Sequence, residues 1–282
     1  MEVSSPLTGR RGVSLPFSDF GGLLSFAPFD LQLLRDELSR LASDRRWNYV
    51  ELRAGEAVGP ATLIPTFFGH TLDLTVGLAA LRASLASAVR RNLRKAEASG
   101  LTAQISGKWE DLLAFYSLHT RTRKRHGLPP QPRTFFSNIY EHLLKPRLGF
   151  VVVAALRTRA VAAAVFLRSG RNAVFKFGAS DDQFQLHRAN NLVMWEAIQH
   201  LTEGGAETLH FGRTSTEHDG LRRFKLGWGS KEQAIVYSRL NPQTTHWSTP
   251  APESTGLHNY IFRTLPLPVN RLLGTLCYPH LD

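Results

Sequence analysis

The sequence predicts an α/β fold in which helices flank one mixed sheet. The first observation is that residues 101–240 alternate between period-two stretches and stretches of helical spacing. The second is that three β-rich runs follow one another with only short turns between them, which is typical of antiparallel strands. The third is the composition of the 282 residues, 43% hydrophobic and 20% charged, which supports a sizeable core and excludes wholesale disorder.

The opening of this region predicts one strand and two helices. Residues 102–106 alternate as a strand does, and a helix then runs to the Gly-Leu-Pro-Pro breaker at 127–130. A second helix fits 134–144 and ends before Pro146. The apolar face of the first helix consists of Trp109, Leu112, Leu113 and Tyr116.

A meander, a crossover helix and further strands are expected next. Asn190 or Asn191 is suited to cap the crossover helix, and Gly204-Gly205 marks its end. A meander followed by a crossover helix produces a sheet with both antiparallel and parallel pairs. The expected strands cover 149–156, 160–168, 173–178, 208–211 and 233–240, with a turn or short helix at 219–224.

The first third of the chain repeats only the back half of that unit. A helix over 31–41 precedes expected strands at 48–53, 62–68 and 70–76. No room remains before residue 30 for the opening strands, so we expect a truncated first unit. The predicted domains are a partial unit at 1–77, a connecting amphipathic helix at 78–100, a complete unit at 101–240, and a linker with a docking tail at 241–282.

The net charge predicts anionic partners. The chain has 34 Lys and Arg against 23 Asp and Glu, a net charge of +11, with a pI near 10.3. Such a surplus attracts nucleic acid, anionic lipid or a phosphorylated substrate. Cys277 is the single cysteine, which excludes an internal disulfide framework and favours a reducing, cytoplasmic compartment. The longest apolar runs are half the length of a membrane helix, and no secretory signal is visible.

Several strings in the chain are those of a known family. The chain resembles the FemAB-like branch of the GNAT acyltransferase superfamily, and 101–240 has the element order of a GNAT unit. The resembling strings are Leu15-Pro16-Phe17-Ser18-Asp19, Arg90-Arg91-Asn92-Leu93-Arg94-Lys95-Ala96, Arg125-His126-Gly127-Leu128-Pro129-Pro130-Gln131-Pro132, Phe175-Lys176-Phe177-Gly178-Ala179-Ser180, Phe211-Gly212-Arg213-Thr214 and Gly220-Leu221-Arg222-Arg223-Phe224-Lys225-Leu226-Gly227-Trp228-Gly229.

The resemblance implies an acyl or aminoacyl donor and an amine acceptor on a cell-envelope precursor such as that of peptidoglycan. It also places the Phe224-Lys225 pair at the substrate site, where the lysine meets phosphate or developing charge. A lysine stabilises an oxyanion or a diphosphate without acting as a base, so Lys225 is the first catalytic candidate. The helical arm of tRNA-dependent family members is missing from this chain.

Other candidates follow from position and chemistry. Asp19 is suited to accept a hydrogen bond from the acceptor amine, or simply to cap a turn. Arg213 and Thr214 follow a strand end, with Arg53 as the counterpart in the first unit, and an arginine there binds phosphate or forms a structural ion pair. Lys176 lies between two phenylalanines on a strand expected to face the cleft. Tyr237 is a candidate proton donor or a packing residue.

Donor binding is expected where the crossover helix begins. Helix N-termini bind phosphate, and GNAT units use a glycine-rich loop there. Here the loop contains Arg188, Asn190 and Asn191 but no glycine, which disfavours close approach of a phosphate to the backbone. The donor is therefore left open between an acyl-CoA and an aminoacyl-tRNA, and a plain capped helix is the alternative.

Several chemistries are disfavoured by missing motifs. The eleven histidines form no H-E-x-x-H motif, so no metal is expected and most of them are assigned to the surface. G-x-S-x-G, P-loop and G-x-G-x-x-G motifs are absent, which disfavours hydrolase, NTPase and dinucleotide-binding functions.

The sequence therefore favours an N-acyltransferase that acts on a phosphorylated or lipid-linked amine. Two alternatives remain, a nucleic-acid or tRNA-binding protein and a non-catalytic GNAT-like assembly protein. We expect a cytoplasmic protein at the inner membrane surface, in peripheral contact with anionic lipid. The sequence leaves the oligomeric state open.

Overall fold

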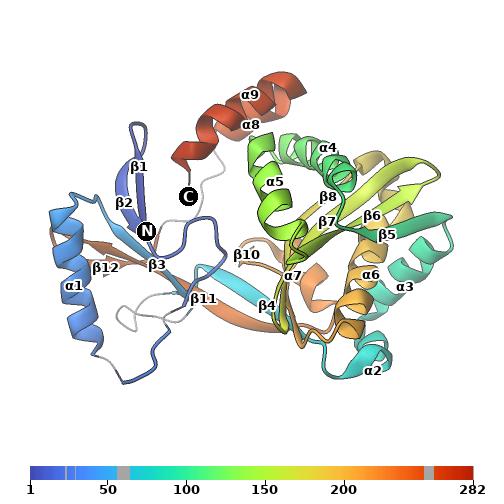
Figure 1. Ribbon diagram of the computed structural model, residues 1–282, viewed down its shortest axis with the longest axis horizontal. Coiled ribbons are helices and arrows are strands. Elements are labelled where there is room, and N and C mark those ends of the chain that lie inside the picture. The colour runs from blue at the N-terminus through green and yellow to red at the C-terminus, as the bar shows by residue number, and fades with distance from the viewer. Residues whose placement is uncertain (23, 29, 56–63, 251–256, 282) are drawn as a thin grey trace.

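The computed structural model describes all of the chain except residues 23, 29, 56–63, 251–256 and 282. The described strands join into one mixed sheet in the order β1-β2-β3-β11-β4-β9-β8-β7-β6-β5, with β10 beside β4 and β12 beside β11 (Figure 1). The strands are β1 Glu2–Ser5, β2 Gly9–Val13, β3 Val50–Gly55, β4 Phe67–Asp73, β5 Leu101–Ser106, β6 Gly149–Leu156, β7 Arg159–Ser169, β8 Asn172–Ser180, β9 Thr208–His210, β10 Thr214–Ser215, β11 Lys231–Asn241 and β12 His246–Ser248.

Helices lie on both faces of the larger part of the sheet. One face is covered by α4 and α5, and the opposite face by α6, against which α2 and α3 pack (Figure 1). The α-helices are α1 Leu31–Asp44, α2 Gly77–Ser84, α3 Ser87–Glu97, α4 Trp109–Arg125, α5 Arg133–Ile139, α6 Ala189–Glu203, α7 Asp219–Leu226, α8 Leu257–Thr264 and α9 Leu267–Cys277. A π-helical turn η1 covers Tyr140–Leu144, and 3₁₀ turns η2 and η3 cover Asp182–His187 and Tyr278–His280.

The predicted α/β class with a mixed sheet is confirmed. The strands β5, β6, β7 and β8 form the expected antiparallel meander, and β8 pairs with β9 in parallel after the crossover through α6. Apolar residues of β6 and β7 alternate between two clusters, so that Val152 and Phe166 face α6 while Val151 and Val165 face α4. Burial on both faces explains the continuous apolar runs in the sequence.

Strand β4 of the N-terminal third lies inside the larger part of the sheet. It pairs antiparallel with β9 on one side and with β11 on the other. Farther along, β11 bends at an irregular step between Val236 and Ser238 and pairs with β3. The first third of the chain therefore contributes β4, directly beside β9, as well as β3, which lies farther along the sheet beyond β11.

Several expected elements differ in the structure. The expected strands at 62–68 and 70–76 correspond among the described residues to a single strand, β4, and residues 62 and 63 lie outside the described part. The stretch before residue 30, expected to hold no strand, contains the β1–β2 hairpin. The expected helix over 78–100 is divided into α2 and α3, because Leu85 and Ala86 have extended backbone.

The C-terminal segment also has more structure than expected. The stretch predicted as a linker from residue 241 contains β12, which pairs with β11, and residues 251–256 are outside the described part. The predicted docking tail forms α8 and α9, and both contact α4 (Figure 1). Gly274 allows the close approach of α9, because a Cβ there would overlap the carbonyl oxygen of Pro130.

Candidate active site

The parallel strands β8 and β9 separate soon after they begin to pair. Residues 172–174 of β8 face residues 208–210 of β9, and β8 then continues alone on that side to Ser180. Ligands of open α/β sheets bind where neighbouring parallel strands separate. The chain after β9 crosses this place as Phe211, Gly212 and Arg213, and it leads into the short strand β10.

The loop before residue 22 places Asp19 against this segment. Gly212 has a φ of 74°, and a Cβ there would lie 3.2 Å from the Asp19 carboxylate, so glycine permits the close approach. The Tyr237 hydroxyl donates a hydrogen bond to the carbonyl oxygen of Asp19. Asp19 is therefore held beside the strand end, with about a quarter of its side chain exposed.

Lys176 of β8 reaches the same loop from the other side. Its ammonium donates to the carbonyl of Phe17 at 2.9 Å and lies 3.9 Å from the Asp19 carboxylate. Phe17 has a φ of 60°, which a phenylalanine rarely adopts, and its ring stacks on Tyr278 of η3. Lys176 thus lies beside Asp19, and both are candidate site residues from the sequence.

Arg213 is positioned by aromatic rings. Its guanidinium lies 4.3 Å from the centre of the Phe67 ring and donates to the Tyr237 hydroxyl at 3.1 Å. Burial raises the pKa of Tyr237, although Arg213 and Arg53 act in the opposite direction. Tyr237 therefore stays protonated at neutral pH and links Arg213 to the Asp19 loop.

Lys225 is buried beneath this group. Its side chain is 2% exposed, and its ammonium donates to the carbonyl oxygens of Gly212 and Arg213 at 2.8 and 3.0 Å. Burial lowers the pKa of Lys225 to about 8, partly offset by Asp19. In this arrangement the ammonium fixes the backbone after β9 and is not presented to a substrate.

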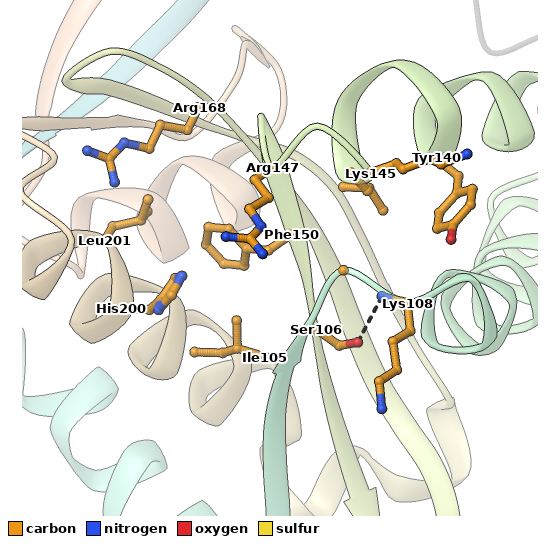
Figure 2. A pocket seen from close by; sticks show the side chains of 13 residues that line it. Ile105, Ser106, Lys108, Tyr140, Lys145, Arg147, Phe150, Arg168, His200 and Leu201 are labelled. Atoms are coloured by element: carbon orange, nitrogen blue, oxygen red, sulfur yellow. Dashed lines mark hydrogen bonds between the residues drawn. The ribbon is translucent and has the colours of Figure 1, made fainter.

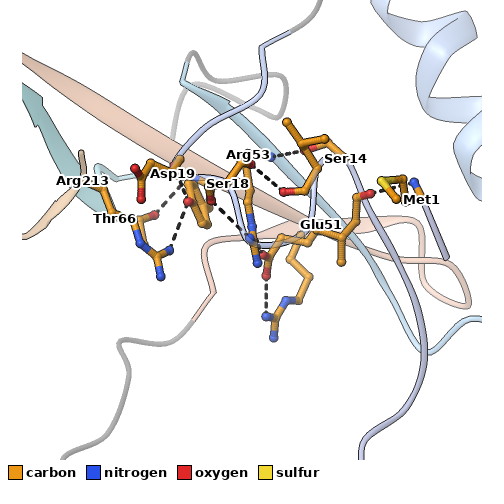
Figure 3. A network of polar contacts seen from close by, with 12 residues as sticks. Met1, Ser14, Ser18, Asp19, Glu51, Arg53, Thr66 and Arg213 are labelled. Carbon is orange, nitrogen blue, oxygen red and sulfur yellow. Dashed lines mark hydrogen bonds and ion pairs between the residues drawn. The ribbon is translucent and has the colours of Figure 1, made fainter. Parts of the chain in front are cut away.

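Arg53 holds the other end of the same loop. It pairs with Glu51 at 3.0 Å and donates to the carbonyl of Ser18 at 3.4 Å (Figure 3). Its backbone N–H binds the Ser14 hydroxyl. Both members of the Arg53–Glu51 pair are buried, so Arg53 supports the loop through an ion pair, which was the structural alternative left open for an arginine at a strand end.

Phe224 and Thr214 lie next to the group without joining its polar contacts. Phe224 packs against the main core and has its ring 6.1 Å from that of Trp228. Thr214 pairs with Phe68 of β4, and its buried hydroxyl has no hydrogen-bond partner among the described residues. Each side chain lies where it can shape the site. Within the described part of the chain, neither forms a side-chain hydrogen bond with another predicted site residue.

The residues expected to bind the donor lie at the start of α6. The helix begins at Ala189 after Arg188, whose φ of 57° is left-handed, and no side chain caps it. The expected cap by Asn190 or Asn191 is therefore wrong. Asn190 donates to the Ser180 hydroxyl instead, while Asn191 is buried. Arg188 and Asn190 are exposed, so both are accessible to an anion at the helix N-terminus.

The predicted site residues thus form two groups. Asp19, Lys176, Arg213 and Lys225 meet around Gly212, with Arg53 and Tyr237 behind the loop. Arg188 and Asn190 lie at the far end of β8, and within the described ranges no hydrogen bond or ion pair connects them to the first group.

His210 and a pair formed by His70 and Glu232 were not predicted from the sequence. His210 accepts a hydrogen bond from the Gly212 N–H, and burial lowers its pKa to about 4, so the ring is neutral. His70 is fully buried and lies 3.0 Å from Glu232, which also binds Arg222. These histidines are exceptions to the assignment of most histidines to the surface, and only the position of His210 at a strand end before Phe-Gly-Arg offered a signal.

These features define an α/β protein with a polar group at the separation of two parallel strands. Residues 83–232, more than half of the chain, match the family model described as acetyltransferase (GNAT) domain. The chain therefore belongs to the GNAT acetyltransferase family. No curated protein matches.

Solved structures show the same fold at low identity. FemX has a TM-score of 0.60 and 16% identity, with 73% of this chain and 74% of that chain covered. The C-terminal domain of a putative lysylphosphatidylglycerol synthetase from Agrobacterium fabrum has a TM-score of 0.53 and 15% identity, covering 74% and 73%. L-PGS from Bacillus licheniformis has a TM-score of 0.50 and 13% identity, covering 86% and 76%.

Two features are absent from the described residues. No group of three or more His, Cys, Asp or Glu side chains in the described ranges is placed to hold a metal ion. Within the same ranges, none of the helices has both the length and the apolar character needed to cross a bilayer.

Proposed function

We propose that this GNAT protein transfers an acyl or aminoacyl group to an amine of a phosphorylated or lipid-linked cell-envelope precursor. The observation that carries the proposal is the meeting of Asp19, Lys176 and Arg213 where β8 and β9 separate. The likeness to FemX and to the lysylphosphatidylglycerol synthetase domain supports a substrate of the cell envelope. We place the reaction on the cytoplasmic side of the inner membrane, where a net charge of +11 favours contact with anionic lipid.

The donor is proposed to be an acyl-CoA, as in GNAT proteins, or an aminoacyl-tRNA. Its phosphates would meet the N-terminus of α6, where Arg188 and Asn190 are exposed. The first backbone N–H groups of a helix and its positive end attract phosphate, and Arg188 adds a charge. The acyl carbon would then lie along the unpaired side of β8.

The acceptor amine is proposed to lie against Asp19. A carboxylate orients an amine through a hydrogen bond, and the cations of Lys176 and Arg213 attract a phosphate on the same molecule. The amine attacks the donor carbonyl directly, the bond from the carbonyl to sulfur or to the tRNA ribose oxygen breaks, and the amine proton leaves with the departing group. Lys225 acts as a positioning residue, because it fixes the carbonyls of Gly212 and Arg213.

Turnover measurements test this proposal. The protein is incubated with a panel of acyl-CoAs and aminoacyl-tRNAs and an amine acceptor, and products are followed by mass spectrometry. Asp19→Asn should lower the rate by about 10²- to 10⁴-fold, since it removes the group that orients the amine. Asp44→Asn, at an exposed position of α1, is the matched control and should leave the rate unchanged.

A second candidate function is a non-catalytic GNAT-like binding protein. It is favoured by the position of the Asp19 loop, which Lys176, Tyr237 and Arg53 hold against the strand separation. Binding of a donor without turnover of any member of the panel would support it. Salt-dependent tRNA binding without turnover would favour the nucleic-acid alternative.

A further inference from the structure

A cavity lies at the opposite end of β8 from the α6 N-terminus. Its volume is about 540 Å³, within the range of small-molecule sites. It lies among the end of β5, η1, the start of β6, the end of β7 and the last turn of α6 (Figure 2). None of the residues assigned above to acyl transfer lines it.

The lining of this cavity is basic. Of its thirteen lining residues, four are Lys or Arg and none is acidic. Arg147 lies in the middle of the group, with Arg168 on one side and Lys145 on the other (Figure 2). Lys145 pairs with Glu141 at 2.9 Å, whereas Arg147 and Lys108 form no ion pair within the described part of the chain. The cavity therefore carries positive charge that the protein leaves uncompensated.

The end of α6 does not account for these cations. Lysine and arginine often gather at a helix C-terminus to bind its last carbonyl groups. Here backbone N–H groups occupy those carbonyls, because Gly204 donates to His200, Gly205 to Thr202 and Ala206 to Leu201. Arg168 donates through Nε to the carbonyl of Gly170, which leaves its two terminal nitrogens for another acceptor.

The floor of the cavity is apolar and aromatic. Phe150 is buried there, with the ring of His200 edge-on at 4.7 Å and Leu201 in the same apolar cluster, while the buried Leu144 also lines the cavity. Arg147 adopts a φ of 62°, a left-handed conformation that arginine rarely adopts. Cations above an apolar floor suit a molecule with both a phosphate group and a planar or apolar body.

We propose that this cavity binds a small phosphorylated molecule with a planar ring, with Arg147 and Arg168 on the phosphate and Phe150 beneath the ring. The site is separate from acyl transfer and does not depend on the function proposed above. Charge-assisted hydrogen bonds dominate the binding, so affinity should fall as ionic strength rises.

Isothermal titration calorimetry with AMP, inorganic pyrophosphate and adenosine tests this site on the full chain. We expect AMP to bind at least tenfold more tightly than adenosine, because only AMP carries the phosphate. Arg147→Ala and Arg168→Ala should each weaken AMP binding by about tenfold or more. Phe150→Leu should weaken AMP binding while leaving pyrophosphate binding unchanged.

Arg157→Ala is the matched control, because Arg157 is also exposed and also left-handed, with a φ of 56°, but lies in the β6–β7 turn. It should change AMP affinity by less than about twofold, as expected of an exposed charge. An equal effect of Arg147→Ala and Arg157→Ala, or no binding of AMP and pyrophosphate, would overturn the proposal. Loss of AMP binding in Arg188→Ala with retention in Arg147→Ala would place the nucleotide at α6 and would also overturn it.

Discussion

The two ends of β11 belong to two differently built regions. Residues 231–235 pair with β4 in the larger region, where apolar clusters fill both faces of the sheet. Residues 238–240 pair with β3 in the N-terminal region, where one face packs under α1 and the other carries buried charge. The apolar cluster under α1 has six buried members among the described residues, Ala42, Trp47, Val50, Leu52, Leu240 and Trp247.

Buried ion pairs replace apolar packing on the second face of the N-terminal region. Side chains alternate along a strand, so Glu51 and Arg53 lie opposite Val50 and Leu52. Glu51 binds Arg53 at 3.0 Å and Arg239 at 2.7 Å. This polar face continues into the loop of Asp19, so the region that packs fewest apolar residues is the one that holds the site loop.

The largest expected difference between the regions is in apolar packing. Phe166→Ala removes a fully buried ring from the larger core and should lower the free energy of unfolding by about 3–5 kcal/mol. Leu52→Ala in the small cluster should cost about 2–3 kcal/mol, because that side chain is smaller and the site can relax toward solvent. Urea unfolding measures both, and a larger loss for Leu52→Ala would contradict the comparison.

Burial of Lys225 should make the free energy of unfolding depend on pH. Its pKa is lowered to about 8 in the folded state, so between pH 8 and about 10.5 the unfolded state binds more protons and stability rises with pH. Below pH 8 the full cost of burying the charge, roughly 3 kcal/mol, is present. Stability of the wild type relative to Lys225→Met, measured by urea unfolding at several pH values, should therefore rise across this window.

A control variant and an activity measurement are needed to interpret the comparison of wild type with Lys225→Met. Lys231→Met, at an exposed lysine of β11, is the control and should show no such rise. A flat difference between wild type and Lys225→Met from pH 8 to 10.5 would show that the Lys225 amine is not buried in solution. If Lys225→Met loses acyl transfer but keeps normal stability, the result would support Lys225 as a positioning residue.

The smallest expected effect is the loss of stability when the buried ion pairs on the polar face of the N-terminal region are broken. Glu51→Gln leaves Arg53 and Arg239 without their carboxylate and should lower the free energy of unfolding by about 2–3 kcal/mol. Glu37→Gln breaks an exposed pair with Arg40 and should cost less than about 0.5 kcal/mol. Equal losses by chemical denaturation would mean that the buried pairs do not stabilise the N-terminal region.

The meander and its helices were predictable from the sequence, because their strands are neighbours in the chain and carry local signals. The runs at 149–156, 160–168 and 173–178 became β6, β7 and β8 with boundaries shifted by no more than two residues. The break between α2 and α3 was not predictable, since the sequence there contains no Pro or Gly. The Ala86 N–H donates to the carbonyl of Gly227, a contact 141 residues away in the chain that replaces a helical hydrogen bond.

In the candidate site, too, some features were predictable from the sequence and others were not. Arg213, Lys225 and Lys176 were recognisable from strand ends and from the family strings, yet their partners were not. Lys225 turned out to bind backbone carbonyls, and Arg53 to bind Glu51, because burial makes such partners necessary. His210 and His70 are buried by strands from different parts of the chain, which no local pattern indicates.

By itself the sequence determined the α/β class, the order of the main elements in residues 101–240, and the family. These depend on periodicity, turn residues and short strings, all of which act over a few residues. Only the tertiary structure decided that β4 lies between β9 and β11, that the loop of Asp19 lies against Gly212, and that a basic cavity forms at the opposite end of β8. Those arrangements arise from pairing and burial between distant segments, whose free energy is settled only when the whole sheet is assembled.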